Sequence, residues 1–181
     1  MYDIAQYNLW KQQFTGFSVY RYDIINYLIK QNNFINYLEI GINNGNTFNR
    51  IKIKHKDGID PRPIGEGISV TNYKIISNEF FESINNHNIK YDIIFIDGLH
   101  YSEQVIQDLT NSLNHIQVNG IIVIHDCNPM FEITQRRYAV VGMWNGDTWK
   151  AFAKFRMTRS DLEMYVVDTD HGVGIVKIGK Q

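Results

Sequence analysis

The sequence predicts an α/β fold in which a mainly parallel β-sheet lies between two layers of helices. Short apolar segments, rich in β-branched residues and each ending at Gly, Asp or His, have the composition of buried strands. Between them lie segments whose apolar residues recur at helical spacing. This alternation is typical of parallel strands joined by helical crossovers. A length of 181 residues suits one such domain.

The alternation of helices and strands runs from residue 23 to residue 124. The predicted helices are residues 23–31, 47–54, 78–87 and 102–116. The predicted strands are residues 36–40, 56–59, 91–96 and 120–124, with a weaker strand around residues 70–76. The last helix is the clearest, because apolar residues repeat along one face from Val105 to Ile116 and Ser102 is a suitable N-cap.

After residue 124 the pattern changes. Residues 147–156 are predicted to form a helix, and residues 163–167 and 173–178 are predicted to form two strands. The connection between these strands is short, which indicates a hairpin and therefore an antiparallel last strand. Residues 129–145 lack a convincing element. Either they form a long functional loop, or they contain a short helix around residues 132–140.

Composition restricts the cellular setting of the protein. A formal net charge of −1 gives no basic field for binding nucleic acid. The single cysteine, Cys127, excludes an internal disulfide framework and fits a reducing cytoplasm. The N-terminus lacks a signal-peptide pattern, and no segment approaches the ~20 apolar residues of a membrane span. We therefore expect one cytoplasmic domain over residues 1–181, with residues 1–35 as a helical lead-in and no membrane partner.

A glycine-bearing turn follows the first predicted strand and opens a helix. Gly41 would let the main chain turn tightly and approach a ligand closely. With Gly45 the spacing is G-x-x-x-G, which differs from the G-x-G-x-x-G signature of dinucleotide-binding folds. Asp60 ends the next strand, 19 residues after Gly41. Its carboxylate could accept both hydroxyls of an adenosine ribose, or it could bond turn N–H groups before Pro61.

Acids and imidazoles follow two later strands. Asp97 and His100 come after one predicted strand, and His125 and Asp126 come after the next. If these strands are neighbours, their ends lie about 5 Å apart at the carboxyl edge, where open α/β sheets bind ligands. Carboxylates that close repel each other unless a proton or a cation lies between them. Oxygen ligands would favour magnesium, calcium or manganese, and imidazole ligands would favour manganese, iron or zinc.

These motifs, taken together, resemble a known family. Glu39-x-Gly41-x-x-x-Gly45 resembles the first motif of class I S-adenosylmethionine-dependent methyltransferases, and Asp60 matches their ribose-binding acid. The closer resemblance is to a small-molecule branch that contains sugar and macrolide O-methyltransferases and cephalosporin hydroxylase-like proteins. The segments that carry it are residues 91–100, 120–129, 144–150 and 168–174, so it covers about residues 36–178.

The resemblance implies a fold and a cofactor site. The implied fold is a Rossmann-like seven-stranded sheet with the order 3-2-1-4-5-7-6, strand 7 antiparallel, and helices on both faces. The implied cofactor is S-adenosylmethionine. The residues placed beside it are Gly41 and Gly45 at the methionine part, Glu39 at the amino group through water, Asp60 at the ribose, Ser77 and Asn78 near the adenine, and Asp97.

The resemblance also implies a catalytic centre. Some metal-assisted relatives have acids at the positions of Asp97 and Asp126 and another acid beside the second, where this chain has His125. Asp97, Asp126 and His125 are therefore the expected ligands of Mg²⁺ or another divalent cation. Such a cation would lower the pKa of an acceptor hydroxyl, and His100 or Asp97 would take its proton. Without a metal, His100 alone would be the base. The alternatives are a hydrogen bond of His100 to the following helix and a buried His125 that supports Asp126.

The expected function is methyl transfer from S-adenosylmethionine to an oxygen of a small molecule, such as a sugar of a surface glycan or a secondary metabolite. One alternative is a nicotinamide-dependent oxidoreductase, against which the glycine spacing and the lack of a Tyr-x-x-x-Lys pair argue. Others are a cofactor-binding protein without turnover and a metal-dependent hydroxylase.

Several further residues have two interpretations. Asp170 and His171 lie near the same sheet edge, but tight-turn chemistry also explains them. Arg136, Arg137 and Trp144 could contact the acceptor from the long loop, or lie on a plain surface. The N-terminal aromatic residues could cover the cofactor or a partner subunit of a homo-oligomer, although ordinary packing is the better explanation.

Overall fold

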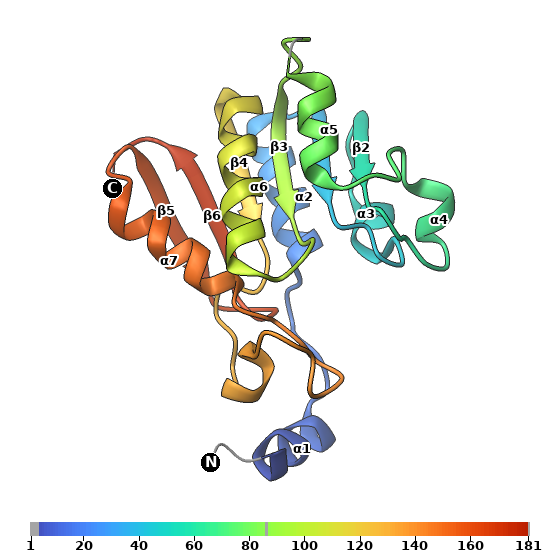
Figure 1. Ribbon diagram of the computed structural model, residues 1–181, viewed down its shortest axis with the longest axis vertical. Coiled ribbons are helices and arrows are strands. Elements are labelled where there is room, and N and C mark those ends of the chain that lie inside the picture. Colours follow the sequence, from blue (N-terminus) through green and yellow to red (C-terminus); the bar gives the residue numbers. More distant parts are fainter. Residues whose placement is uncertain (1–3, 86, 181) are drawn as a thin grey trace.

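The structure is a computed structural model that describes residues 4–85 and 87–180. Within these residues lies a six-stranded sheet with the order β2-β1-β3-β4-β6-β5 (Figure 1). The strands are β1 (Asn36–Ile40), β2 (His55–Ile59), β3 (Tyr91–Ile96), β4 (Ile116–Ile124), β5 (Leu162–Val167) and β6 (Val173–Ile178).

The strand pairing aligns the ends of the first four strands. β1 pairs in parallel with β2 and β3, and β3 pairs in parallel with β4. The register places Ile40 beside Ile59 and Ile96, and Ile96 beside Ile124. The residues that follow these four positions therefore meet at one edge. β6 is antiparallel to β4 and β5, which confirms the predicted hairpin and antiparallel last strand.

The prediction of seven strands was wrong, although the observed order matches 3-2-1-4-5-7-6 once strand 3 is omitted. Residues 70–76, the predicted third strand, form no strand. They contribute the end of α4 (Gly67–Val70) and an isolated bridge from Tyr73 to Ile59. The side chain of Asn72 explains the difference. Its carbonyl oxygen accepts the N–H of Gly58 at 2.8 Å, so that N–H is not free to extend a ladder.

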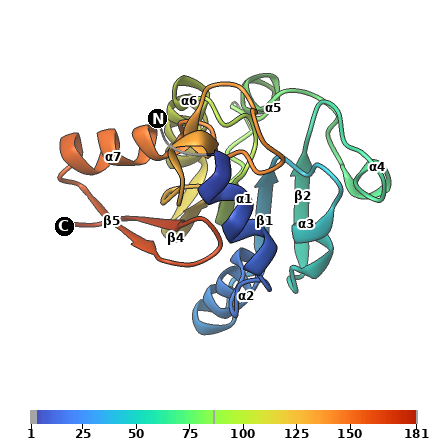
Figure 2. The same ribbon diagram turned by 90° about the horizontal axis from the view of Figure 1, so that it is seen from below.

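Helices cover both faces of the sheet (Figures 1 and 2). One face packs against α2 (Arg21–Asn32) and α3 (Asn46–Arg50). The other packs against α5 (Ser77–Ile84), α6 (Ser102–His115) and α7 (Thr148–Thr158). Strand alternation divides the core accordingly: Ile93 and Phe95 face α2, whereas Ile94 and Ile96 face α6.

Several helix bounds differ from the sequence prediction, including the end of α5 at Ile84 where residue 87 was predicted, and two of the differences have a clear cause. The helix predicted at residues 47–54 stops at Arg50, because the chain then returns toward β2 and the N–H of Lys52 bonds the Asn26 side chain at 2.8 Å. Ser102 is not the N-cap of α6. Tyr101 holds that position, and the carboxylate of Asp147 accepts the N–H of Ser102 at 2.7 Å. A distant acid therefore satisfies this helix end.

The long segment 129–145 contains one short element, the 3₁₀ helix η1 (Glu132–Gln135), and is otherwise irregular. It lies beyond the carboxyl ends of the strands, where α1 (Ile4–Gln13) also lies (Figure 1). Tyr7 and Trp10 of α1 pack on Phe131 of this segment, with ring centroids 5.8 and 5.3 Å apart. Among the described helices, none combines the length and apolar character needed to cross a membrane.

Candidate active site

The turn after β1 is shaped by Gly41. Its φ of +93° lies in the left-handed region, and a Cβ at this position would stand 2.1 Å from the carbonyl oxygen of Asp97. Only glycine allows this contact between the ends of β1 and β3. The turn is tied to Asp60, whose carboxylate accepts the N–H of Asn43 at 2.7 Å. Its other oxygen accepts the N–H of Arg62 at 2.7 Å, as the turn interpretation expects.

Glu39 is buried in β1, with 1% of its surface exposed. Its carboxyl group accepts a hydrogen bond from the hydroxyl of Tyr37 at 2.5 Å. Burial raises the pKa of Glu39 to about 8, although the bond from Tyr37 opposes the change. The carboxyl group is therefore mostly protonated at neutral pH.

Replacing Glu39 by glutamine is expected to flatten the pH dependence of stability. The pKa of Glu39 is about 8 in the folded protein and 4.5 as a free side chain, so its stabilising contribution is complete below pH 4.5 and is lost as pH rises through 8. Over this range, wild type should lose roughly 1.4 kcal/mol of unfolding free energy per pH unit relative to Glu39→Gln. Urea denaturation at several pH values measures this difference. The exposed Glu163→Gln is the control, and parallel pH curves for wild type and Glu39→Gln would contradict the expectation.

Ser77 and Asn78 lie at the start of α5, where they face α6. The Ser77 hydroxyl donates to the buried carboxylate of Asp108 at 2.6 Å. The side-chain amide of Gln104 donates to Ser77, Asn78 and Asp108 at 3.2, 3.2 and 2.9 Å. These bonds join two helices, and the expected proximity of Ser77 and Asn78 to adenine stays a prediction.

The ends of β3 and β4 bring four predicted side chains together. The Nδ1 atom of His125 lies 3.3 Å from Asp97 Oδ1 and 3.2 Å from Asp126 Oδ2. The Nδ1 atom of His100 lies 3.2 Å from Asp126 Oδ2, and its Nε2 lies 3.5 Å from Asp97 Oδ1. The two carboxylates thus face each other across two imidazoles, and Asp97, His100, His125 and Asp126 together are called the acid–imidazole cluster below.

Arg21, at the start of α2, contacts this cluster and was not predicted from the sequence. Its Nη1 atom donates to Asp170 Oδ2 at 3.0 Å, and its Nε lies 3.6 Å from Asp97 Oδ2. The Nε–H also bonds the hydroxyl of Thr47, in α3, at 3.2 Å. Arg21 belongs to no motif that could have indicated it. Asp170 is both a turn residue, with φ +45°, and a partner of Arg21, so both of its interpretations apply.

His125 is held between two groups with opposite requirements. Its Nε2 lies 2.7 Å from both Arg21 Nη1 and the main-chain oxygen of Asp170. A guanidinium nitrogen only donates and a carbonyl oxygen only accepts, so Nε2 can bond one of them at a time. Neutral His125 accepts from Arg21, and protonated His125 donates to Asp170.

The charges of the cluster stabilise one another. Although burial opposes it, His125 and Arg21 hold the pKa of Asp97 well below its usual range. Burial likewise opposes protonation of the imidazoles, but the carboxylates of Asp97 and Asp126 raise the pKa values of His100 and His125. The cluster therefore combines buried acids with cations supplied by the protein.

The main chain is strained at two neighbouring positions, Asp126 after β4 and His171 before β6. Asp126 has φ +60° and His171 has φ +65°, values that residues other than glycine seldom adopt. The N–H groups of Cys127 and Asn128 bond the carbonyl oxygens of Gly172 and His171, both at 2.9 Å, and so hold this conformation. Such strain is concentrated at functional sites.

The cluster has the ligands for a divalent cation. Asp97, His100 and Asp126 each offer one ligand atom, and these atoms lie within 4.8 Å of one another. Two carboxylate oxygens suit magnesium, calcium or manganese, and one imidazole nitrogen favours manganese, iron or zinc, so manganese fits the whole set. This set contains His100 where we expected His125; the Nδ1 atom of His125 also lies close to both acids, and its part in binding a cation stays a prediction.

Three residues of the segment 129–145 were predicted to contact the acceptor, and their surroundings differ from one another. The Trp144 ring stacks on His100, with ring centroids 5.0 Å apart. Arg137 is paired with Glu103 and lies 4.1 Å above the Tyr101 ring, so its charge is already compensated. Arg136 is exposed.

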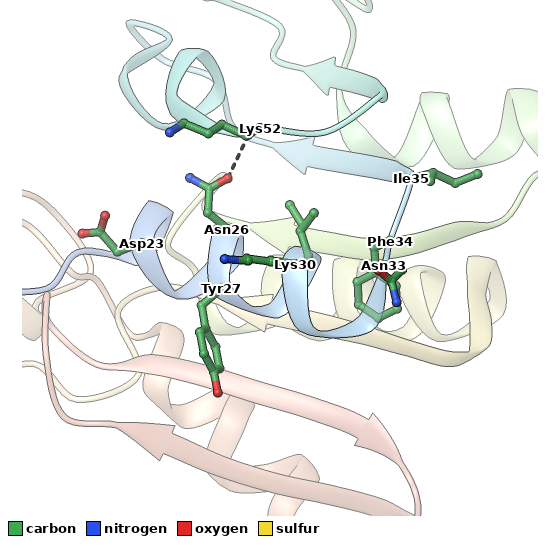
Figure 3. A pocket seen from close by; sticks show the side chains of 9 residues that line it. Asp23, Asn26, Tyr27, Lys30, Asn33, Phe34, Ile35 and Lys52 are labelled. Atoms are coloured by element: carbon green, nitrogen blue, oxygen red, sulfur yellow. Dashed lines mark hydrogen bonds between the residues drawn. The ribbon is translucent and has the colours of Figure 1, made fainter.

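A hollow elsewhere on the surface is separate from this cluster. It has a volume of about 770 Å³ and is lined by α2, residues 33–35 and Lys52 (Figure 3). The Asn26 side chain within it accepts the N–H of Lys52, and its amide donates to the Arg50 carbonyl at 2.9 Å. No residue of the acid–imidazole cluster lines this hollow, so it is not the candidate active site.

The fold is shared with solved O-methyltransferase structures. TomG from Streptomyces achromogenes, solved with S-adenosylmethionine, has a TM-score of 0.64 at 10% identity, with 99% of this chain and 91% of TomG covered. An O-methyltransferase from Bacillus cereus, solved with S-adenosylhomocysteine, has a TM-score of 0.61 at 13% identity, with 95% and 86% covered. The mycinamycin methyltransferase MycE, solved with magnesium, S-adenosylhomocysteine and mycinamycin VI, has a TM-score of 0.55 at 16% identity, with 85% and 49% covered.

Sequence comparison identifies the family. No curated protein matches the sequence. A family described as a methyltransferase domain matches residues 38–127, which run from the middle of β1 to the residue after Asp126. The match includes the Gly41 turn and both strand ends of the acid–imidazole cluster. These residues therefore belong to the methyltransferase-domain family, as the sequence motifs predicted.

Proposed function

We propose that the protein transfers a methyl group from S-adenosylmethionine to an oxygen of a small molecule. The observation that carries this proposal is the arrangement at one sheet edge. The Gly41 turn and Asp60 lie at the ends of β1 and β2, and the acid–imidazole cluster lies at the ends of β3 and β4. A cofactor and an acceptor bound at this edge would be neighbours. Structures with the same fold contain S-adenosylmethionine or S-adenosylhomocysteine, which supports the choice of cofactor.

The residues at the edge fit this cofactor. When bound, S-adenosylmethionine supplies an electrophilic methyl group on a sulfonium. The Gly41 turn and Gly45 would border its methionine part, and the Glu39 carboxyl group would lie near its amino group, with a water between them. Asp60 would bind the ribose, and Ser77 and Asn78 would lie near the adenine.

His100 is placed to act as the base. Its Nδ1 faces two acceptors, the Trp144 carbonyl oxygen at 3.1 Å and Asp126 Oδ2 at 3.2 Å, so Nδ1 carries the hydrogen. In neutral His100, Nε2 is therefore the basic nitrogen, and it can take the proton of an acceptor hydroxyl. The protein would align that oxygen with the methyl group, which is a proximity effect.

A divalent cation would bind Asp97, His100 and Asp126, with His125 close to both acids. Such a cation would lower the pKa of an acceptor hydroxyl. MycE, of which this chain covers 49%, was solved with magnesium. The roles of His100 as base and as cation ligand are alternatives, because its Nε2 cannot take a proton while it binds a cation, and Asp97 belongs to the same ligand set.

The wider assignments are also proposals. A sugar or a secondary metabolite is the proposed acceptor, and nucleic acid is not, because the net charge is −1. We propose one cytoplasmic domain over residues 1–181 that can form a homo-oligomer. Residues 1–35 would be its lead-in.

Replacing Asp60 by alanine is expected to weaken S-adenosylhomocysteine binding by about tenfold or more, because charge-assisted bonds to the ribose are lost. Calorimetric titration measures this loss. A 2′-deoxy analogue should lose less affinity than the parent compound in the variant, since it makes fewer bonds to Asp60. Asp161→Ala, which removes a surface acid, is the control. Unchanged affinity in folded Asp60→Ala would mean that Asp60 only supports the turn.

The function itself is tested by incubating the protein with S-adenosylmethionine labelled in the methyl group and a panel of hydroxylated sugars and aromatic compounds. Label should pass to oxygen of an acceptor, with EDTA and added magnesium reporting on the cation. Stabilisation by NAD and none by S-adenosylhomocysteine would favour the oxidoreductase alternative. Iron- and oxygen-dependent product without label would favour the hydroxylase.

A further inference from the structure

The turn formed by Trp144, Asn145, Gly146 and Asp147, called the 144–147 turn below, lies against the acid–imidazole cluster. The amide of Asn145 donates to Asp126 Oδ1 at 2.5 Å, and both residues are 2% exposed. Asp126 Oδ2 faces the imidazoles of His100 and His125, both at 3.2 Å. One Asp126 oxygen is thus anchored by Asn145, and the other is presented to the site.

The same turn also holds His100. The N–H of Asp147 bonds the carbonyl oxygen of His100 at 3.0 Å, and the Asp147 carboxylate accepts the N–H of Ser102. Gly146 permits this contact, because its φ is +60° and a Cβ would lie 2.1 Å from the His100 carbonyl oxygen. Thr134 holds the main chain of the 144–147 turn, because its carbonyl oxygen accepts the N–H groups of Asn145 and Gly146.

The orientation of the Asn145 amide follows from Asp126. Among the described residues, the buried Oδ1 of Asn145 has no hydrogen-bond partner, which carries a free-energy cost. The flipped amide would place this oxygen against the carboxylate of Asp126, where two acceptors repel each other. The observed orientation therefore serves the carboxylate, at the expense of an unpaired oxygen.

We propose that Asn145 is the positioning residue of Asp126 and that, through it, the 144–147 turn keeps Asp126 Oδ2 on the Nδ1–H groups of His100 and His125. This inference rests on the proposed function for its catalytic consequence. Loss of the Asn145 amide should let the Asp126 carboxylate rotate. Methyl transfer should then fall about 10- to 100-fold, as it does when partners of ligating groups are removed, while S-adenosylhomocysteine affinity stays within about twofold.

Proton NMR of the imidazole N–H groups tests the positioning directly and needs neither acceptor nor cofactor. In EDTA-treated wild type, the Nδ1–H protons of His100 and His125 should give downfield signals protected from exchange with water. Both signals should shift or broaden in Asn145→Ala, because the Trp144 carbonyl oxygen and Asp97 Oδ1 are then the remaining acceptors of the two Nδ1–H groups. They should also shift or broaden in Asn145→Leu, which keeps a side chain of similar size but loses the donor, and which serves as the test if Asn145→Ala fails to fold.

Asn128→Ala is the matched control, because it removes another Asn–Asp bond, to Asp168 at 2.9 Å, outside the cluster. Its imidazole signals should match those of wild type. Signals that keep their wild-type positions and widths in a folded Asn145 variant, or that are absent from wild type, would overturn the proposal. If wild type gives the signals but does not bind S-adenosylhomocysteine, the proposed function fails and the positioning stands.

Discussion

Replacing His100 by asparagine is expected to lower the rate of methyl transfer by about 10²- to 10⁴-fold, the usual contribution of a positioned base. An asparagine amide can take over the hydrogen bond that Nδ1 gives to the Trp144 carbonyl oxygen, but it supplies no basic nitrogen in place of Nε2. S-adenosylhomocysteine affinity should stay within about twofold, because the change removes chemistry and not binding. Initial rates and calorimetric titration of the same preparation measure both quantities.

His87→Asn is the matched control for this variant. The Nδ1 of His87 lies 3.0 Å from the Ser83 carbonyl oxygen, which is a comparable contact. Both residues are exposed, Ser83 in α5 and His87 after the end of this helix. This control should retain the wild-type rate. A folded His100→Asn variant that also retains it would remove His100 from the mechanism.

Replacing Arg21 by methionine is expected to lower the free energy of unfolding by about 3 kcal/mol, because breaking a largely buried ion pair leaves uncompensated charge. Asp97 and Asp170 would lose a shared cation, and His125 would lose a neighbour 2.7 Å from its Nε2. The pKa values of both acids are lowered in the folded protein, partly by Arg21, so this stabilisation is present at neutral pH and is lost as pH falls through them.

Urea denaturation at neutral pH measures the effect of Arg21→Met. Arg21→Lys should recover part of the lost stability, since it keeps the charge but not the several directed N–H groups. Arg159→Met, which removes an exposed pair with Asp161, should change stability little. An Arg21→Met variant as stable as wild type at neutral pH would show that Arg21 does not compensate the cluster.

The parallel part of the fold could be predicted because buried strands and amphipathic helices leave strong local patterns. Residues 36–40 and 91–96 were predicted with the bounds that β1 and β3 have in the structure. The third strand failed because its pattern was weak and a side chain, that of Asn72, takes the N–H of Gly58. Bonds of this kind depend on where a side chain lies in space, which periodicity does not indicate.

The site was predictable to the extent that strand ends determine it. Asp97 and Asp126 follow strands that proved to be neighbours, so their convergence follows from the topology. Arg21 could not be found this way, because 104 residues separate it from His125 and it lies on a helix without a motif. Asn145 reaches Asp126 from an irregular segment whose path only tertiary packing defines.

Calorimetric titration of the protein with S-adenosylhomocysteine, in EDTA and again with added magnesium, tests the central claim most directly. The proposed site predicts saturable binding of one molecule per chain, in EDTA as well, because neither the Gly41 turn nor Asp60 supplies a proposed metal ligand. A further gain on adding magnesium would point to a cation at Asp97, His100 and Asp126. No binding in either condition would contradict the claim that this sheet edge binds the methyl donor.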